Sequence, residues 1–249
     1  MKIKKHITAL ATAAALSATL PAVAQQSQHM TPETMLSLAR VGASALSPDG
    51  KTVVYSVGFP SIKDNKIRTE LFTISSDGSA RRQITQGVAG VHGARWIQQG
   101  RRISYISSES GAPQVWTMAP DGTDRRQVTN IEGGLSDYLF SPDEKQLAYI
   151  KEISFGKSTK EIYPDLPKAT GRIVTDLMYK HWDEWVETIP HIFIAPVGGE
   201  AITGGKDILE GEPYEAPTKP FGGAEELSWS PDGKTLAYSS RKKTGMEYS

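Results

Sequence analysis

The sequence contains no cysteine, and this absence excludes disulfide bonds and thiolate metal sites. It also lacks the motif Gly-x-Ser-x-Gly, the strained turn that exposes a nucleophilic serine. No two of the five histidines have the spacing of a metal-binding pair such as His-Glu-x-x-His. We therefore expect no catalytic residue, no metal site and no cofactor within these 249 residues.

An excess of charge of either sign is absent as well. The chain has 28 Lys and Arg residues against 28 Asp and Glu residues, so neither nucleic acid nor acidic lipid is expected as a partner. Apolar residues make up 38% of the chain and charged residues 22%, which is typical of a folded domain and not of a disordered one.

The one apolar run lies at the amino terminus. Lys2, Lys4 and Lys5 precede an alanine-rich segment that is too short and too weakly apolar for a membrane span. The small residues at Ala22–Ala24 fit a cleavage site, so residues 1–24 are predicted to be a signal peptide cleaved after Ala24. The mature chain is then periplasmic or secreted and makes no membrane contact. A retained, uncleaved anchor is the alternative.

What the sequence does contain is repetition. "ASALSPDGKTVVYSV" at 43–57 returns as "LSWSPDGKTLAYSS" at 227–240. Ser-Pro-Asp-Gly is a turn sequence, and it places Gly50 and Gly233 in the left-handed conformation. The alternating β-branched and aromatic residues that follow predict a strand, so each phrase is a β-hairpin.

Weaker copies of this hairpin stand at 95–108 and 139–151. A second phrase with an Asp-Gly turn, at 70–85 and 114–129, alternates with the first, and a third, weaker version lies at 191–202. Two hairpins in alternation make a unit of four strands, which is the organisation of a β-propeller blade.

The spacing of the repeats supports this fold. The markers Gly50, Gly100, Glu144 and Gly233 are 50, 44 and 89 residues apart, and a period of about 40 to 50 residues is typical of propeller blades. We predict an all-β, partial propeller over 43–249. An open antiparallel meander or a sandwich is the alternative. About three and a half blades are present, starting near Ala43, Val91 and Leu135, with only the opening hairpin of a fourth and with an insertion at 152–190 in the third.

Residues 25–42 form a linker with a short helix. Thr31 suits the N-cap and Pro32 the first helical position, and the helix is expected to end near Gly42. Its apolar face would consist of Met35, Leu36 and Leu38. At the other end, the chain stops soon after a blade begins. We expect an amino-terminal piece of a longer protein, the alternative being a complete short protein whose halves pair between chains.

The insertion is predicted to contain a helix over 176–187. Asp183 and Glu187, at i and i+4, place like charges on one face, which is unfavourable unless a cation lies between them. A purely structural role is the alternative, with Glu184 paired to Lys180 and the tryptophans anchoring the helix. The apolar face of this helix would comprise Met178, Trp182, Trp185 and Val186.

These features resemble a known family. The opening "MTPETMLSLARVGASALSPDGKTVVYSV", the "DG…RRQ(I/V)T" hairpins and "DLMYKHWDEWVETIPHIFIA" are similar to the amino-terminal propeller of secreted bacterial serine peptidases of the prolyl oligopeptidase family, dipeptidyl peptidase 5 branch. The resemblance covers 25–249, and 179–189 is its more specific part. It implies an α/β-hydrolase domain with a Ser-Asp-His triad further along the chain and absent here, so that this piece alone is inactive.

The resemblance also implies a role for the propeller. The propeller would admit only short peptides to the active site, and acidic residues of the insertion would bind the amino group of the substrate. Its partners would be short peptides and the carboxy-terminal hydrolase domain of the same chain, and a homodimer stays open. The helix lacks the adjacent Glu-Glu pair of better-known dipeptidyl peptidases. The candidate substrate-binding residues are Asp183, Glu184, Glu187, Trp182 and Trp185.

A second hypothesis belongs to a different class of protein. Non-enzymatic periplasmic propellers, similar to that of the Tol–Pal system, use the same kind of blade to bind proteins. Their repeats are shorter and more regular, so the insertion at 152–190 favours the peptidase.

Overall fold

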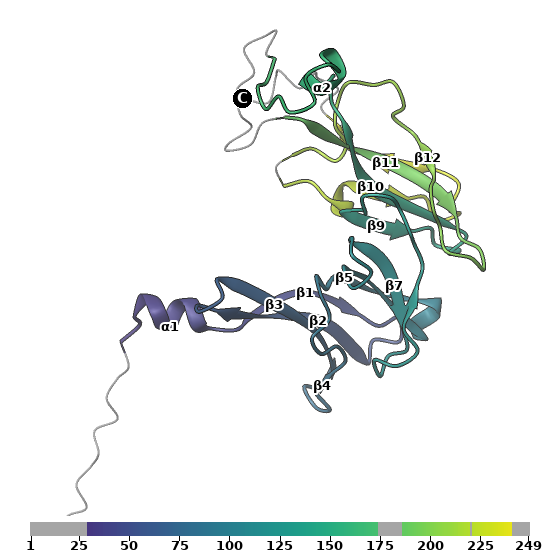
Figure 1. Cartoon of the computed structure of the whole chain (residues 1–249). Coiled ribbons are helices and arrows are strands. Elements are labelled where there is room, and N and C mark those ends of the chain that lie inside the picture. The colour runs from purple at the N-terminus through teal and green to yellow at the C-terminus, as the bar shows by residue number, and fades with distance from the viewer. Residues whose placement is uncertain (1–28, 174–185, 220, 241–249) are drawn as a thin grey trace, which may run out of the picture.

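The computed structural model describes residues 29–173, 186–219 and 221–240. Three four-stranded antiparallel sheets follow one another along the chain, and a two-stranded sheet comes last (Figure 1). The all-β fold of four-stranded blades is therefore confirmed, and the ring of blades is not closed. No described helix is long and apolar enough to cross a membrane. The predicted signal peptide lies outside the described residues.

The strands of each sheet pair in chain order, as expected for consecutive hairpins. Blade 1 consists of β1 (Arg40–Leu46), β2 (Thr52–Ser61), β3 (Lys66–Ser75) and β4 (Arg82–Gln83). Blade 2 consists of β5 (His92–Ile97), β6 (Arg102–Ser107), β7 (Gln114–Met118) and β8 (Arg126–Gln127). Blade 3 consists of β9 (Asp137–Phe140), β10 (Gln146–Ser154), β11 (Thr188–Pro196) and β12 (Lys206–Asp207). Blade 4 contributes β13 (Leu227–Trp229) and β14 (Leu236–Tyr238) to the described residues.

The Ser-Pro-Asp-Gly turns have the predicted geometry. In blade 1 the Ser47 hydroxyl donates to Asp49 Oδ1 at 2.6 Å and accepts from the backbone N–H of Thr52 at 2.9 Å. Gly50 has φ +71° and Gly233 has φ +68°, both in the left-handed region that favours glycine. The expected left-handed positions are thus confirmed, and the same side-chain bonds recur at Ser230 in blade 4.

Neighbouring turns of this type also touch one another. A Cβ on Gly100 would lie 3.3 Å from Cδ of Pro48, in the turn of the preceding blade. Glu144 Oε1 accepts a hydrogen bond from the backbone N–H of Gln98, in a short 3₁₀ segment (η1, Gln98–Gly100). The β1–β2 turn and its counterparts in later blades therefore form a continuous row.

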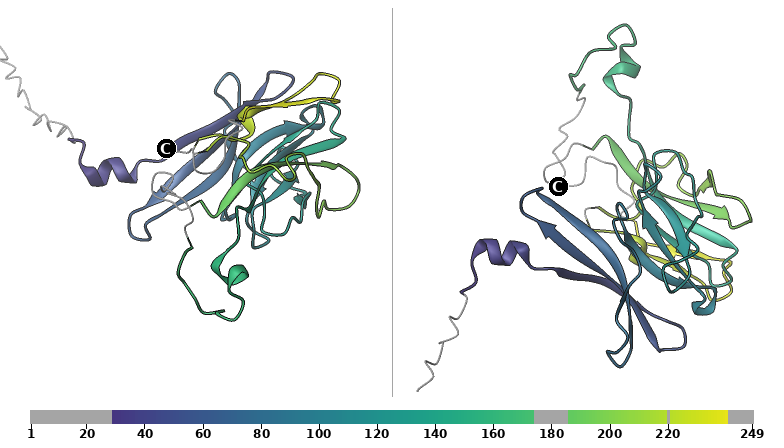
Figure 2. Two further views of the ribbon diagram at one scale, coloured as in Figure 1. Left: turned by 90° about the horizontal axis from the view of Figure 1, so that it is seen from above. Right: turned by 60° about the horizontal axis from the view of Figure 1, so that its bottom comes forward.

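Apolar residues fill the space between consecutive blades. One cluster joins blades 1 and 2 and includes Val54, Leu71, Ile103 and Tyr105. A second cluster joins blades 2 and 3, and a third joins blade 3 to blade 4 and to residues 208–224 before it. Figure 2 shows the sheets stacked against one another, while α1 and the segment carrying α2 project from them. Each blade is therefore stabilised by burial against its neighbours.

The amino-terminal helix is shorter than the sequence suggests. α1 spans Pro32–Ser37, and its N-cap Thr31 accepts a hydrogen bond from the backbone N–H of Thr34, as predicted. The helix ends well before Gly42, because strand β1 already begins at Arg40 and pairs with β2. About half of the surface of each predicted apolar side chain remains exposed, namely Met35, Leu36 and Leu38.

The insertion is bounded by longer strands than expected. β10 and β11 pair without interruption from Gln146 and Pro196 to Ser154 and Thr188, so the connection between them is residues 155–187. Within it lies one turn of helix, α2 (Thr159–Ile162). Most of the predicted helix at 176–187 lies outside the described residues, and its last two positions, Val186 and Glu187, are not helical.

Candidate functional site

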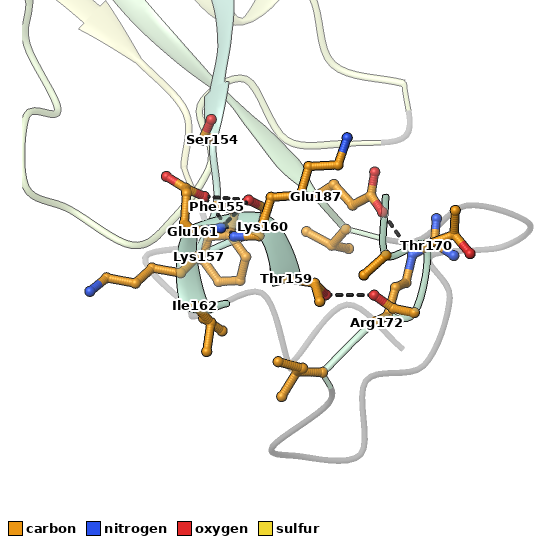
Figure 3. A pocket seen from close by; sticks show the side chains of 16 residues that line it. Ser154, Phe155, Lys157, Thr159, Lys160, Glu161, Ile162, Thr170, Arg172 and Glu187 are labelled. Carbon is orange, nitrogen blue, oxygen red and sulfur yellow. Dashed lines mark hydrogen bonds and ion pairs between the residues drawn. The ribbon is translucent and has the colours of Figure 1, made fainter. Parts of the chain in front are cut away.

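A hollow of about 620 Å³ lies at the base of the insertion (Figure 3). Its walls come from the end of β10, from α2, from residues 169–173 and from Val186 and Glu187. Phe155, Ile162 and Ile173 supply apolar surface, while hydroxyl and charged side chains supply the rest. The lining residues Val186 and Glu187 belong to the helix predicted over 176–187, so the hollow adjoins the predicted site.

α2 is held in place by its own cap. The Ser158 hydroxyl accepts from the backbone N–H of Glu161, and the Glu161 carboxylate accepts from the hydroxyl and the backbone N–H of Ser158 at 2.7 Å each. These bonds, the hydroxyl contribution being the larger, lower the pKa of Glu161 from its usual range. Glu161 is therefore ionised at neutral pH and committed to the cap.

Glu187 is the one predicted site residue that the structure describes. Its carboxylate accepts from Arg172 Nε at 2.7 Å, and its backbone carbonyl accepts from the N–H of Phe155 at 2.9 Å (Figure 3). The Thr159 hydroxyl donates to the carbonyl of Gly171 at 2.5 Å. This hydrogen bond connects α2 to the segment 169–173, which carries Arg172. Both charged side chains remain about half exposed, so the ion pair is open to solvent and to a ligand.

The other four predicted residues, Asp183, Glu184, Trp182 and Trp185, lie outside the described residues. Arg172 was not anticipated from the sequence. It precedes Glu187 by 15 positions, and a basic residue at that distance has no recognisable pattern. Only the closure of the insertion on itself brings the two side chains together.

The charges of the described lining are mixed. Lys157, Lys160 and Arg172 are basic, against the carboxylates of Glu161 and Glu187. Because Glu161 is engaged in the cap, Glu187 is the one carboxylate of the described lining that can face a bound cation. The positive charge of Arg172, which is paired with Glu187, would lie near that cation and weaken its binding. The hollow can therefore bind and orient a polar group.

The described residues around the hollow include no group of side chains arranged for catalysis or metal binding. In the described part of the chain no cluster of three His, Asp or Glu side chains could hold a metal ion. His191 Nδ1 lies 2.8 Å from Asp207 Oδ2, but this pair is enclosed within blade 3, where the His191 side chain is fully buried. The pair stabilises β11 against β12 and lines no part of the hollow.

Comparison with known proteins shows which proteins this chain is similar to. No family model matches the sequence. Dipeptidyl-peptidase 5 of Porphyromonas gingivalis is 63% identical over 222 residues, which cover 89% of this chain and 32% of that protein. Dipeptidyl-peptidase 5 of Porphyromonas endodontalis is 50% identical over 224 residues, covering 90% of this chain and again 32% of the relative.

Among solved structures, the apo form of AtxE2 isopeptidase gives a TM-score of 0.52 at 16% identity over 71% of this chain and 32% of that chain, a similarity of fold. The chain spans about a third of the length of the curated relatives that it matches. The resemblance to dipeptidyl-peptidase 5 predicted from the sequence is thereby confirmed: over nearly its whole length this chain is similar in sequence to about a third of each of these two proteins.

Proposed function

We propose that these residues are the propeller of a longer, exported serine peptidase that removes dipeptides from the amino end of short peptides. The observation that carries this proposal is the 63% identity to a protein named dipeptidyl-peptidase 5. At that identity the fold and the binding surfaces of two proteins are expected to correspond closely. The relatives are about three times as long as the matched region, which leaves room for a hydrolase domain with a Ser-Asp-His triad.

The propeller would serve this reaction by selection and binding. A ring of blades over the hydrolase domain admits peptides of limited size, and the insertion of blade 3 binds the free amino group of the substrate. The proposed contacts are charge-assisted hydrogen bonds from the ammonium group to Asp183, Glu184 or Glu187, with Trp182 and Trp185 beside them. The position of Glu187 at the edge of the hollow, half exposed and oriented by Arg172, supports this assignment.

The test compares substrates with free and blocked amino termini. In the full-length enzyme, Asp183→Asn, Glu184→Gln and Glu187→Gln are each measured on dipeptidyl substrates. Replacing a carboxylate that binds the ammonium group by an amide should raise KM for the free substrate by about tenfold or more. The reason is that an ionic hydrogen bond contributes roughly 1.5 to 3 kcal/mol. Substrates with a blocked amino terminus should change much less.

Arg172→Gln is the matched control for Glu187. This change also breaks the ion pair but keeps the Glu187 carboxylate, so a preference for free substrates that is lost in Glu187→Gln and kept in Arg172→Gln assigns the binding to the carboxylate. If all three amide variants leave the preference for free over blocked substrates unchanged, the amino group is bound elsewhere. Export is tested separately by amino-terminal sequencing of the mature protein. The first residue should be Gln25 if the signal peptide is cleaved after Ala24.

A further inference from the structure

Strand β10 extends beyond its neighbour β9 at the end of the blade that carries the insertion. Pairing with β9 reaches Ile150, whose carbonyl also accepts from the N–H of Ser136 at 2.9 Å. The chain before Ser136 turns away, since the N–H of Leu135 donates to the carbonyl of Pro113 in blade 2 at 3.0 Å. In the described part of the chain, residues 151–154 of β10 are therefore paired on one side only, with β11.

The backbone groups on the unpaired side follow from the alternation of the strand. The N–H of Phe155 donates to the carbonyl of Glu187 on the β11 side, whereas the carbonyl of Ile150 faces the β9 side. Successive residues of an antiparallel strand point their backbone groups to opposite sides, so those of Glu152 and Ser154 face the β9 side. Both residues are exposed, and these groups have no hydrogen-bond partner among the described residues. We call their N–H and C=O groups the open edge, with Glu152 as its first and Ser154 as its second residue.

The other blades close the equivalent edge. At the same distance from the start of the second strand, blade 1 has Gly58, which pairs with Arg40 of β1, and then Pro60, which has no N–H. In blade 2 the counterpart of the first residue is Ser108, whose N–H donates to the carbonyl of Ala89 at 2.8 Å. Of the three four-stranded sheets that the structure describes, blade 3 is therefore the one that presents both N–H groups.

The open edge has the chemistry of a peptide-binding strand. Free N–H and C=O groups along a strand bind a second extended backbone, which adds to the sheet as a further strand. The Glu152 carboxylate is paired with Lys219 Nζ at 3.0 Å, so the first residue offers mainly its backbone groups. Ser154 lines the hollow at the base of the insertion (Figure 3). A peptide paired with the open edge would therefore have one end at the hollow.

We propose that the substrate peptide binds as a short strand on the open edge, antiparallel to β10, with its first residue opposite Ser154 and its third residue opposite Glu152. This inference rests on the proposed function, which brings the amino end of the substrate to the hollow. The first residue accepts from the N–H of Ser154 and donates to its carbonyl, and the third residue exchanges the same two bonds with Glu152. An ammonium group has three donors, so two remain for carboxylates.

The chain itself limits the length of the bound strand. A fifth residue of the peptide would stand opposite Ile150, whose carbonyl is already bonded to Ser136. The open edge therefore pairs with the first few residues of a peptide, and the rest must turn away. Only main-chain groups of the substrate take part in these bonds, so peptides of different sequence bind in the same way.

This register leaves the second residue of the peptide free. It stands opposite Ile153, so its N–H and C=O groups point away from β10. Its carbonyl belongs to the bond that must break when a dipeptide is released. That carbonyl therefore stays accessible to a nucleophile from outside the propeller, while the residues on both sides of it are held by the open edge.

The first test removes one donor of the open edge. Ser154→Pro in the full-length enzyme deletes the N–H, and blade 1 shows that a proline fits at this position of the strand, as Pro60. Ser154→Ala measures the effect of losing the side chain alone. KM for dipeptidyl substrates should be about three- to tenfold higher in Ser154→Pro than in Ser154→Ala, because one hydrogen bond is lost. Equal KM values in the two variants would overturn the inference.

The register is tested by disulfide trapping, which the absence of cysteine from these 249 residues favours. Ser154→Cys and Ile153→Cys are introduced singly into the full-length protein. Each is mixed with tetrapeptides that carry cysteine as the first or the second residue and a CH2–NH bond in place of the amide between the second and third residues, which prevents cleavage. The unsubstituted protein is the control for any cysteine elsewhere in the chain.

Residues opposite each other on paired strands have their side chains on the same face. Ser154→Cys should therefore trap the first-position peptide about tenfold faster than the second-position peptide, and Ile153→Cys should show the reverse preference. Rates without this alternation would overturn the inference and leave the proposed function intact. Because trapping needs no cleavage, alternating rates in a protein that releases no dipeptides would support the open edge as a peptide site and count against the proposed function alone.

Discussion

Blades 1 and 3 share one frame but differ in the buried polar pair at its centre. In blade 1 the Glu70 carboxylate, fully buried, accepts from the Thr85 hydroxyl at 2.8 Å and from the backbone N–H of Gly87 at 2.7 Å. In blade 3 the residue at the same position is His191, whose Nδ1 lies 2.8 Å from Asp207 Oδ2. The side-chain chemistry changes completely while the strands keep their places.

Blade 2 shows how this substitution is tolerated. Gln114 stands at the position of Glu70, and its Oε1 accepts from the Thr129 hydroxyl at 2.7 Å and from the N–H of Ile131 at 2.9 Å. In each of blades 1 to 3 the pair ties the third strand to the chain at or just after the fourth. The position therefore accepts different buried polar residues, provided that each bonds to the chain at or just after the fourth strand, because a buried polar group without any partner is unfavourable.

The largest expected effect is at Glu70. Glu70→Ala leaves the Thr85 hydroxyl and the Gly87 N–H without their acceptor in a buried site, and this should lower the free energy of unfolding by about 2 to 4 kcal/mol. Glu70→Gln should cost much less, because glutamine fills the same position in blade 2. Denaturant unfolding of the full-length protein measures both, and equal losses would show that the carboxylate itself is required.

The next effect concerns the blade 3 pair. His191→Ala and Asp207→Ala should each destabilise the protein by about 1 to 3 kcal/mol, since each leaves a buried polar partner. The double variant should lose less than the two single losses combined, by about 1 kcal/mol, because the two side chains interact directly. A double-mutant cycle on melting curves measures this coupling. If the loss in the double variant equals the sum of the two single losses, the two side chains do not stabilise each other. That result would contradict the equivalence of this pair with those of blades 1 and 2.

The turns provide a third contrast between the blades. Gly50 of blade 1 corresponds to Glu144 of blade 3, which has φ +56°. Gly50→Val should cost on the order of 1 to 2 kcal/mol, because a β-branched residue is strained in the left-handed region. Glu144→Gly should be nearly neutral, since relief of strain offsets the lost hydrogen bond to Gln98.

Gly198→Val is the control for Gly50→Val. A Cβ at Gly198 meets nothing within 4 Å and its φ is not left-handed, whereas a Cβ at Gly58 would lie 3.0 Å from Ile67 Cγ2. Gly198 therefore separates backbone strain from crowding, which Gly58 does not. Melting temperatures of the full-length variants provide the comparison, and a loss at Gly198 as large as that at Gly50 would contradict the explanation by strain.

The smallest expected effect concerns the aspartates of the Ser-Pro-Asp turns, which behave in the same way in blades 1 and 3. The Ser47 hydroxyl lowers the pKa of Asp49, and the Ser141 hydroxyl lowers that of Asp143 in the same way. A depressed folded-state pKa stabilises the protein above about pH 4 and the contribution is lost as the pH falls through the folded-state pKa. Ser47→Ala and Ser141→Ala should therefore lower the melting temperature slightly at neutral pH, and part of the difference should disappear in acid. A difference that does not change with pH would exclude this linkage.

The blades could be predicted from the sequence because their signals are local. Ser47, Pro48, Asp49 and Gly50 are consecutive, and their turn chemistry fixes a hairpin without knowledge of the rest of the chain. The predicted end of α1, near Gly42, was wrong because it depends on a contact that is not local. Pairing of β1 with β2 begins at Arg40 and overrides helix propensity. Contacts such as Arg172 with Glu187 depend on the path of a long connection, which no spacing rule predicts.

The row of turns that joins the blades has a consequence for how this protein can vary in length. Because Gly100 lies against Pro48 and Glu144 reaches Gln98, an extra residue in one turn would displace its neighbour. The connections between second and third strands have no such constraint, and they range from residues 62–65 to residues 155–187. Evolution and protein engineering can therefore add new segments between the second and third strands, while the turn between the first and second strands keeps a fixed length.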